Sequence, residues 1–411
     1  MSNAIRADFD QVIDHLRQAI QPLALAPIAT PLLEAEGCIL AQDICAQFDF
    51  PLFDNSAMDG FAIRSSDFAS TDPSVLTMPI CGIATAGHPF EEEVPHGAAL
   101  RIMTGAPIPP GLDAVIPIEQ TEVIDQTVRF APGLLTPGSN VRHQGEIFHS
   151  SECLLSSHRR LTRGDLGLAA SLGYATLPCQ PRLRVAVFSS GDELIEPQDG
   201  RALTDGKIYN ANGVFVTLAA RAIGADATYL GILPDDAAII EEKFKSAAQT
   251  YDLVICSGGV GPGDCDFTAS VLNRMADLHH YHVAMRPGKP FSFGTFRSGR
   301  ALILGLPGNP VATATSAEFF LRYAMACLEG VPYEELTLTA KLVGKIKTRA
   351  GRRDFIRGQL SFDETEGLVF RPVNQQSSAS LLSVSQSNAI AEIPESMVGT
   401  LTEGQLKVHL R

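Results

Sequence analysis

The sequence lacks the features that direct a chain into or across a membrane. It contains no run of about 18 apolar residues, so we expect no transmembrane helix. The N-terminal stretch MSNAIRADFDQ has neither the basic region nor the apolar region of a signal peptide. The eight cysteines are scattered without a CxxC pair, which is typical of a reducing compartment and argues against a structural zinc site. We therefore expect a cytoplasmic protein.

Basic charge is also scarce. The chain of 411 residues has 32 lysines and arginines against 46 aspartates and glutamates, a formal net charge of −14. A nonspecific nucleic-acid binder needs a basic face, so we expect no nucleic-acid partner. An anionic small ligand remains compatible with this total, because a local basic pocket can outweigh the average charge. The length predicts roughly two to four domains, and 45% hydrophobic residues suffice for several cores.

The usual signatures of nucleotide binding and hydrolysis are missing as well. The chain has neither a GxxxxGK[ST] loop nor a GxGxxG loop in the required context, and it has no GxSxG elbow. Cys256 ends an apolar run, and we interpret it as a core residue rather than a nucleophile. Several histidines show no metal-binding spacing, namely His88, His96, His143, His149 and His158.

The distribution of apolar residues divides the chain into regions of different character. Residues 8–20 form an amphipathic helical stripe with acidic residues at its start. Residues 30–180 alternate short apolar runs with Pro/Gly breaks, which predicts a β-rich or mixed fold with one inserted lobe. After residue 181 strands alternate with helices, which predicts an α/β domain with a parallel sheet covered on both faces. Short strand-like runs from residue 337 predict a small β-barrel or sandwich. In the α/β region, the expected strands are 184–190, 227–233, 252–259 and 301–308, and the expected helices are 212–225, 236–249, 267–277 and 312–330.

Four loops at the carboxyl ends of the expected strands have the composition of a binding site. They read SSGDEL (189–194), PDD (234–236), SGGVGPGDCD (257–266) and GLPGNPVATATS (305–316). Ligands of an open α/β sheet gather at this edge, where glycines let the backbone approach a phosphate. Turns and helix caps explain Ser189 or Asp236 equally well. Gly258 and Gly259 followed by Asp264 and Asp266 exceed what a cap needs.

A stiff basic turn follows one of the apolar runs. In the stretch RPGKP, two prolines and a glycine present Arg286 and Lys289. A solvated basic turn is the alternative reading. Together with the acidic glycine-rich loops, the turn fits a polyphosphate held by cations, backbone amides and carboxylate-bound Mg²⁺. In the first half of the chain, DNSAMDGFA and RIMTGAP are by themselves ordinary turns.

Seven segments in order along the chain point to one family. They are DNSAMDGFA, RIMTGAPIP, SSGDEL, YNANG, SGGVGPGDCDFT, MRPGKPFSFG and LPGNP, and they span nearly the whole chain. Together they resemble the molybdopterin molybdenumtransferase family, the bacterial relatives of the C-terminal part of gephyrin. The resemblance implies a mixed N-terminal domain (1–50 and 140–181), an inserted β-rich lobe (51–139), a molybdopterin-binding α/β domain (182–330) and a C-terminal β-barrel-like domain (331–411). It also implies a homodimer whose active site lies between the α/β domain of one subunit and the inserted lobe of the other.

The resemblance further implies a reaction in molybdenum cofactor biosynthesis. The substrates would be adenylylated molybdopterin and molybdate, the metal cofactor Mg²⁺, and the products AMP and molybdenum cofactor. Transient contacts with a molybdopterin adenylyltransferase and with molybdoenzyme chaperones are also implied. The residues carried over as catalytic are Asp59, Thr104, Glu193, Asp235 and Asp266, with Glu193, Asp235 and Asp266 as metal ligands. Those carried over for substrate or molybdate binding are Gly258, Gly259, His282, Arg286, Lys289, Arg357 and Ser377.

The chain departs from the family pattern at three places. His282 stands where a lysine is frequent, which puts molybdate affinity or its pH dependence in question. Arg286 replaces a common lysine with a planar, bidentate cation. The loop reads GVGPGD where GVSxGE is commoner, which weakens a role for Asp264.

Two other classes of function compete with the transferase. A pterin- or nucleotide-binding scaffold would bind the ligand and leave its pyrophosphate intact, so AMP release separates it from the enzyme. A nucleotide-amidase-type relative would share the α/β domain only, and the flanking motifs from Asp54 to Ser377 argue against it.

Overall fold

The computed structural model describes residues 4–67, 75–131, 135–200, 202–259, 267–333, 335–379 and 381–411. These residues form two compact units. The first comprises Met1–Ala41, His158–Thr162 and Leu177–Arg411, and the second comprises Gln42–Ser157 and Arg163–Thr176. Every helix within the described residues is too short or too polar to cross a membrane.

The chain begins with a short strand and a capped helix in the first unit. Strand β1 (Ile5–Ala7) precedes helix α1 (Phe9–Ala19). Asp8 accepts a hydrogen bond from the backbone of Gln11, and the Gln11 side chain accepts one from the backbone of Asp8. This capping box satisfies donors that the first helical turn leaves free. The buried face of α1 is the apolar stripe expected from the sequence.

A seven-stranded sheet is the centre of the first unit. Its order is β1, β19 (Ala276–Val283), β21 (Pro290–Phe296), β22 (Leu302–Leu306), β18 (Leu253–Ser257), β14 (Arg184–Ser190) and β17 (Asp226–Leu233). Six of these strands run in one direction, and β21 runs against its neighbours β19 and β22. The predicted α/β sheet is thereby confirmed, extended by three strands that the sequence did not predict, β1, β19 and the antiparallel β21. Strand β21 reverses because the short basic turn connects β19 to β21 directly, without a crossover helix.

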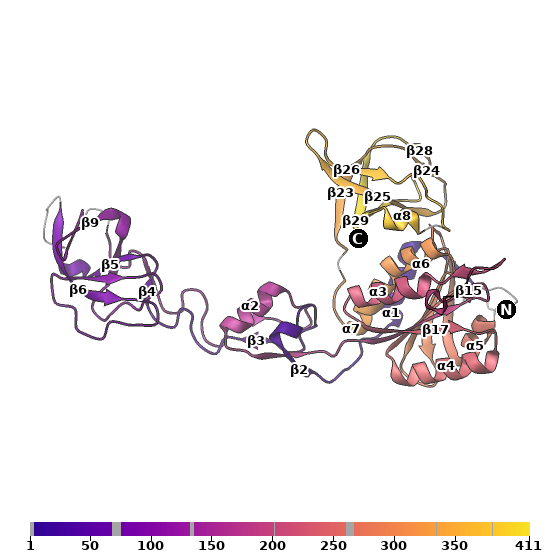
Figure 1. Ribbon diagram of the computed structural model, residues 1–411, viewed down its shortest axis with the longest axis horizontal. Helices are drawn as coiled ribbons and strands as arrows, with labels where there is room; N and C mark the ends of the chain where they lie inside the picture. The colour runs from indigo at the N-terminus through magenta and orange to yellow at the C-terminus, as the bar shows by residue number, and fades with distance from the viewer. Residues whose placement is uncertain are drawn as a thin grey trace. The chain divides into compact units, whose positions relative to one another are not determined.

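Helices cover both faces of this sheet. One face packs against α1, α3 (Asn212–Ala222) and a continuous helical stretch formed by α6 (Pro310–Ser316), a π-helical turn (Ala317–Leu321) and α7 (Arg322–Glu329). The other face packs against α4 (Ala237–Thr250) and α5 (Phe267–Met275), which lie side by side in Figure 1. Alternate residues of β14 point to opposite faces, as expected for a strand buried on both sides. The helix predicted at 267–277 ends earlier, at Met275, because Ala276 already belongs to β19.

The C-terminal region of the first unit is a closed barrel, which confirms the predicted β-barrel. Its strands are β23 (Thr337–Leu342), β25 (Arg353–Asp363), β26 (Gly367–Pro372), β27 (Ala389–Ile393) and β29 (Gln405–Leu410). They pair in the order β25, β26, β23, β29, β27, and β27 closes on β25. Strand β20 (Met285–Arg286) joins the barrel by pairing with the start of β25. The remaining elements of this region are β24 (Ile346–Thr348), β28 (Gly399–Leu401) and α8 (Leu382–Ser385).

The second unit contains a six-stranded sheet. Its order is β8 (Ala114–Pro117), β5 (Gly60–Ile63), β7 (Ala99–Ile102), β6 (Leu76–Ala84), β10 (Thr127–Phe130) and β9 (Thr121–Ile124). Hydrophobic clusters lie on both of its faces. The predicted β-rich character of this region is confirmed. Outside this sheet, the second unit contains β3 (Ile44–Cys45), β4 (Asn55–Ser56), β11 (Val141–Arg142), β12 (Cys153–Leu155) and α2 (Arg163–Ser171).

Candidate functional site

The carboxyl ends of four neighbouring strands meet at one edge of the large sheet. Ser190 of β14 is opposite Leu233 of β17, and Ser257 of β18 is opposite Leu306 of β22. The loops that begin with SSGDEL, PDD, SGG and GLPGNP therefore leave the sheet side by side. This is the edge at which open α/β sheets bind ligands.

Gly258 and Gly259 are required at this edge by the close approach of the backbone. Both residues have positive φ angles, 85° and 63°. A Cβ atom on Gly258 would lie 2.2 Å from the backbone oxygen of Ser190, and one on Gly259 would lie 2.6 Å from the Ser190 Oγ. The absence of side chains at these positions lets the backbone of the loop pack directly against Ser190.

Two buried asparagines of the YNANG segment tie the loops together. The amide of Asn212 donates to the Ser257 Oγ at 2.8 Å and to the backbone oxygen of Gly308 at 2.7 Å. The side-chain oxygen of Asn210 accepts from the Ser189 Oγ at 3.1 Å. The sequence analysis included YNANG among the family segments but assigned no role to Asn210 or Asn212. Their contacts assign them to fixing the loops rather than to contacting a ligand.

The predicted acidic residues of this edge lie on two neighbouring loops. Glu193 and Asp235 are exposed and follow β14 and β17, respectively. The next residue, Asp236, caps α4 by accepting from the backbone of Ala238 and Ile239 at 2.8 and 3.1 Å. The cap reading of Asp236 is thereby confirmed. Asp264 and Asp266 lie outside the described residues.

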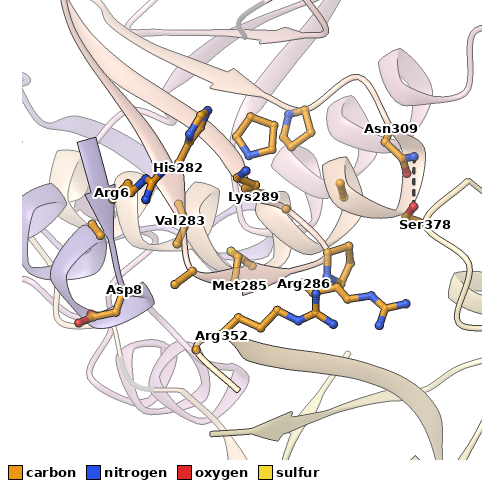
Figure 2. A pocket seen from close by; sticks show the side chains of 18 of the residues that line it. Arg6, Asp8, His282, Val283, Met285, Arg286, Lys289, Asn309, Arg352 and Ser378 are labelled. Carbon is orange, nitrogen blue, oxygen red and sulfur yellow. Dashed lines mark hydrogen bonds between the residues drawn. The ribbon is translucent and has the colours of Figure 1, made fainter. Parts of the chain in front are cut away.

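A cavity of about 780 Å³ adjoins this edge; because several basic side chains line it, it is called the basic cavity. Its basic residues are Arg6, His282, Arg286, Lys289 and Arg352 (Figure 2). Asp8 is the single carboxylate among the described lining residues. Arg6, Arg286 and Lys289 have no carboxylate partner in the described part of the chain, so their charge is available to a ligand. An acidic protein thus concentrates positive potential in one place.

The basic cavity brings together predicted residues and residues that the sequence did not single out. His282, Arg286 and Lys289 were candidates, and all three line it. Arg6 joins them because β1 pairs with β19 and sets Arg6 opposite His282. Asn309 donates to the Ser378 Oγ at 3.4 Å on another wall, as the dashed line in Figure 2 marks. No local signal in the sequence identifies Arg6, because only the strand pairing places it here.

Arg357 is a buried cation beside a second cavity of about 560 Å³, which Arg286 also lines. Its side chain is 3% exposed. Its Nε donates to the Ser383 Oγ and its Nη1 to the backbone oxygen of Phe355, both at 3.3 Å, while its Nη2 has no partner among the described residues. Burial, followed by the charges of Arg286 and Arg411, lowers the pKa of Arg357 to about 10. A buried cation without a counter-charge is what an anion site requires.

Ser377 lies next to these residues but does not line the basic cavity. It is exposed, and its Oγ accepts from the backbone of Ala379 at 3.3 Å. The preceding Gln376 donates to the backbone oxygen of Arg357 at 2.8 Å, which holds this turn against β25. The neighbouring Ser378 is the residue that reaches the cavity.

In the second unit, Asp59 and Thr104 form a single exposed pair. Asp59 follows β4, and Thr104 follows β7. The Asp59 Oδ1 accepts from both the backbone N–H and the Oγ1 of Thr104 at 2.7 Å. These two bonds, the backbone one first, lower the pKa of the Asp59 carboxyl group. The carboxylate is therefore ionised and held in one orientation.

One cluster of potential metal ligands occurs elsewhere among the described residues, namely Glu335, Glu392 and His409. Lys407 lies 3.3 Å from Glu335 and 2.9 Å from Glu392, and Arg353 lies 3.0 Å from Glu392. These cations already supply the counter-charge that a metal ion would supply. The cluster is an ion-pair network that holds the barrel to the adjoining chain, and it offers no metal site.

Comparisons with known proteins cover most of the chain. The profile described as MoeA N-terminal region (domain I and II) matches residues 7–173, the one described as "Probable molybdopterin binding domain" matches residues 186–326, and the one described as MoeA C-terminal region (domain IV) matches residues 339–406.

Curated relatives and a solved structure agree with these profiles. A molybdopterin molybdenumtransferase of Haemophilus influenzae is 39% identical over 350 residues, 84% of either chain. One of Synechococcus elongatus is 35% identical and covers 94% of this chain and 95% of its own. The crystal structure of a molybdopterin biosynthesis moeA protein from Pyrococcus horikoshii matches with a TM-score of 0.85 at 27% identity, over 99% of this chain and 100% of that one. The molybdopterin-binding profile matches the α/β sheet at whose edge the basic cavity lies. The chain belongs to the molybdopterin molybdenumtransferase family.

Proposed function

We propose that the chain inserts molybdate into adenylylated molybdopterin and releases AMP, and that the basic cavity holds the anionic groups of both substrates. The observation that carries this proposal is that Arg6, Arg286 and Lys289, which have no carboxylate partner among the described residues, line one cavity at the sheet edge of a chain with a net charge of −14. Both substrates are anions, and cleavage of a pyrophosphate develops further negative charge. Fixed cations stabilise that charge without reorganisation during the reaction.

In this proposal each cation has a role that follows from how exposed its side chain is. Arg286 and Lys289 are exposed at the mouth of the basic cavity and bind phosphate or molybdate oxygens from solvent. Arg357 is buried beside the adjoining cavity, which Arg286 also lines. Its Nη2, which has no partner among the described residues, donates a hydrogen bond to the oxyanion there. His282 lines the same cavity, and we propose that it contacts molybdate there.

The exposed carboxylates fit the ligand chemistry of Mg²⁺. This ion is bound in enzymes by one or two carboxylates together with substrate phosphates and water. Glu193 and Asp235 supply exposed oxygen ligands at the ends of neighbouring strands, and we propose that they hold the ion together with Asp266. The ion would neutralise phosphate charge when bound.

Asp59 and Thr104 complete the proposed site from the second unit. Because the bonds from Thr104 keep Asp59 ionised and in one orientation, its carboxylate is suited to accept a hydrogen bond from an attacking water. We propose that the chain acts as a homodimer in which this pair serves the basic cavity of the partner protomer. The four-domain division at residues 1–50 with 140–181, 51–139, 182–330 and 331–411 belongs to the same proposal.

AMP release from adenylylated molybdopterin, with molybdate and Mg²⁺ present, tests the reaction. Arg286→Gln and Lys289→Gln should each lower the rate roughly 100-fold. Arg274→Gln, a half-exposed arginine of α5 outside the cavity, is the matched control and should leave the rate unchanged. Undiminished AMP release in both cavity variants would reject the assignment. Binding of the substrate without AMP release by the native chain would favour a scaffold instead.

Co-expression of two inactive variants tests the homodimer. Asp59→Ala and Lys289→Gln damage different halves of the proposed site. In a mixed dimer, one of the two sites receives both intact halves, so random pairing should restore about a quarter of the native activity. A mixture as inactive as its components would contradict a shared site.

A further inference from the structure

A cavity rich in arginine, distinct from the basic cavity and from the cavity beside Arg357, lies in the first unit away from the proposed active site. It has a volume of about 730 Å³ and is called the arginine cavity. Its arginines are Arg159, Arg160, Arg182, Arg221 and Arg322. The two carboxylates in its lining are Glu36 and Glu329. Two of these arginines are paired with carboxylates, Arg160 with Glu329 at 2.5 Å and Arg322 with Glu318 at 3.0 Å.

The arginine cavity is separate from the basic cavity. Arg182 lies two residues before β14, and Arg221 donates to the backbone oxygen of Ala227 near the start of β17. The basic cavity lies beyond the opposite ends of the sheet strands. A seven-residue strand such as β14 spans roughly 20 Å. One ligand in the proposed active site therefore does not reach both cavities.

Two arginines of this cavity, Arg182 and Arg221, are held by neutral acceptors. Arg182 donates to the backbone oxygens of Gly224 and Glu36 at 3.2 and 3.4 Å. Arg221 donates from Nε and Nη2 to the oxygen of Ala227 at 2.9 and 2.7 Å. A carbonyl oxygen orients a guanidinium group without neutralising it, so these two side chains keep their full charge.

Arg160 is held in the same way and is also paired. Its Nη1 donates to the backbone oxygen of Gly37 at 2.7 Å, and its Nη2 contacts Glu329 at 2.5 Å. Gly224 makes room for it, because a Cβ atom there would lie 2.9 Å from the Arg160 Nη1 and the φ angle is +100°. Burial raises the pKa of Glu329, although the charge of Arg160 opposes the rise. The cavity thus contains two cations, Arg182 and Arg221, that backbone carbonyls orient.

We propose that the arginine cavity binds a small organic polyanion that carries at least two phosphate or carboxylate groups. Arginine forks match the oxygens of either group in pairs. Apolar side chains such as Ile223, Met325 and Val331 line the same cavity and suit the organic part of such a ligand. Its volume is within the range of small-molecule sites, about 300–1,000 Å³.

Arginine labelling with phenylglyoxal, read by peptide mass spectrometry, tests this site directly. The native chain would be labelled with and without pyrophosphate or citrate, and with sodium chloride at equal ionic strength. We expect pyrophosphate, citrate or both to protect Arg159, Arg182 and Arg221, while chloride does not. The anion that protects at the lower concentration identifies the class of group that the site prefers.

Variants then link protection to the cavity. Arg182→Gln keeps an amide donor for the carbonyls but loses the charge, and it should raise the half-protecting anion concentration at Arg221 about tenfold or more. Arg274→Gln should leave it unchanged. Three results would overturn the proposal. They are protection by neither anion, equal protection by chloride, and protection that varies with the concentration of the protein rather than with that of the anion. The readout does not depend on AMP release, so the proposed reaction can fail without affecting it.

Discussion

Replacing Arg357 with methionine should stabilise the ligand-free chain while abolishing its response to molybdate. Arg357 is 3% exposed, and its Nη2 has no partner within the described residues. Burial, then the charges of Arg286 and Arg411, lowers its pKa from 12.5 to about 10. The buried charge of Arg357 therefore lowers the free energy of unfolding of the ligand-free chain, and a bound anion offsets this loss.

The magnitude follows from this pKa shift. The shift corresponds to roughly 3 kcal/mol of unfavourable free energy for the charged side chain in the folded state. Methionine removes this cost but forfeits the bonds to Ser383 and Phe355, each worth about 1 kcal/mol. We therefore expect the free energy of unfolding of the ligand-free variant to rise by about 1 kcal/mol, in line with other buried charges replaced by apolar residues.

Urea unfolding at neutral pH, with and without molybdate, measures both effects. At one hundred times its dissociation constant, molybdate should stabilise the native chain by about 2.7 kcal/mol and leave Arg357→Met nearly unaffected. Arg274→Met serves as the control and should respond to molybdate like the native chain. The reasoning fails if ligand-free Arg357→Met loses more than about 2 kcal/mol, or if molybdate stabilises it as much as the native chain.

Three further predictions concern the backbone, the barrel and the second unit. Gly258→Ala should cost more than about 2 kcal/mol in urea unfolding, because its Cβ would clash with Ser190. Gly367→Ala also has a positive φ but open space around it, and an equal loss there would contradict the role of the clash. Burial would raise the pKa of Glu392, but hydrogen bonds from His409 and Lys407 lower it to about 2. Its contribution of about 3 kcal/mol is therefore present above pH 4.5 and is lost as the pH falls toward 2. The stability difference between the native chain and Glu392→Gln should shrink over that range, and a constant difference would refute the assignment. Asp59→Asn should abolish AMP release with an unchanged melting temperature, because the side chain is exposed, and full activity would exclude it from the site.

Hydrophobic patterns predicted the strands and helices of the α/β region well where breakers flank them. Strand β14 has the predicted bounds, since apolar residues fill both of its faces and polar loops follow. The boundary between α5 and β19 was missed because Met275 and Ala276 offer no Gly or Pro to mark it. Strand β1 has only three residues, and it exists because β19 provides an edge to pair with. Such pairing between distant segments leaves no local trace in a sequence.

The same distinction separates the site residues that could be predicted from those that could not. Arg286 and Lys289 stand on a stiff, basic turn, which is a local signal. Arg6 reaches the same cavity through the pairing of β1 with β19, which local patterns do not encode. Arg357 was a candidate through family resemblance alone, and nothing in its flanking residues indicated that its charge would be buried without a counter-ion.

The most direct test of the account is to locate a heavy oxyanion in crystals of the native chain. Tungstate is a dianion of the same shape as molybdate, and its anomalous scattering identifies the site without assumptions about activity. We expect a tungsten peak within about 4 Å of the cationic groups of Arg286, Lys289 or Arg357, as charge-assisted contacts require. A saturated crystal with no peak near any of these three residues would contradict the claim that these cations bind the inserted metal oxyanion.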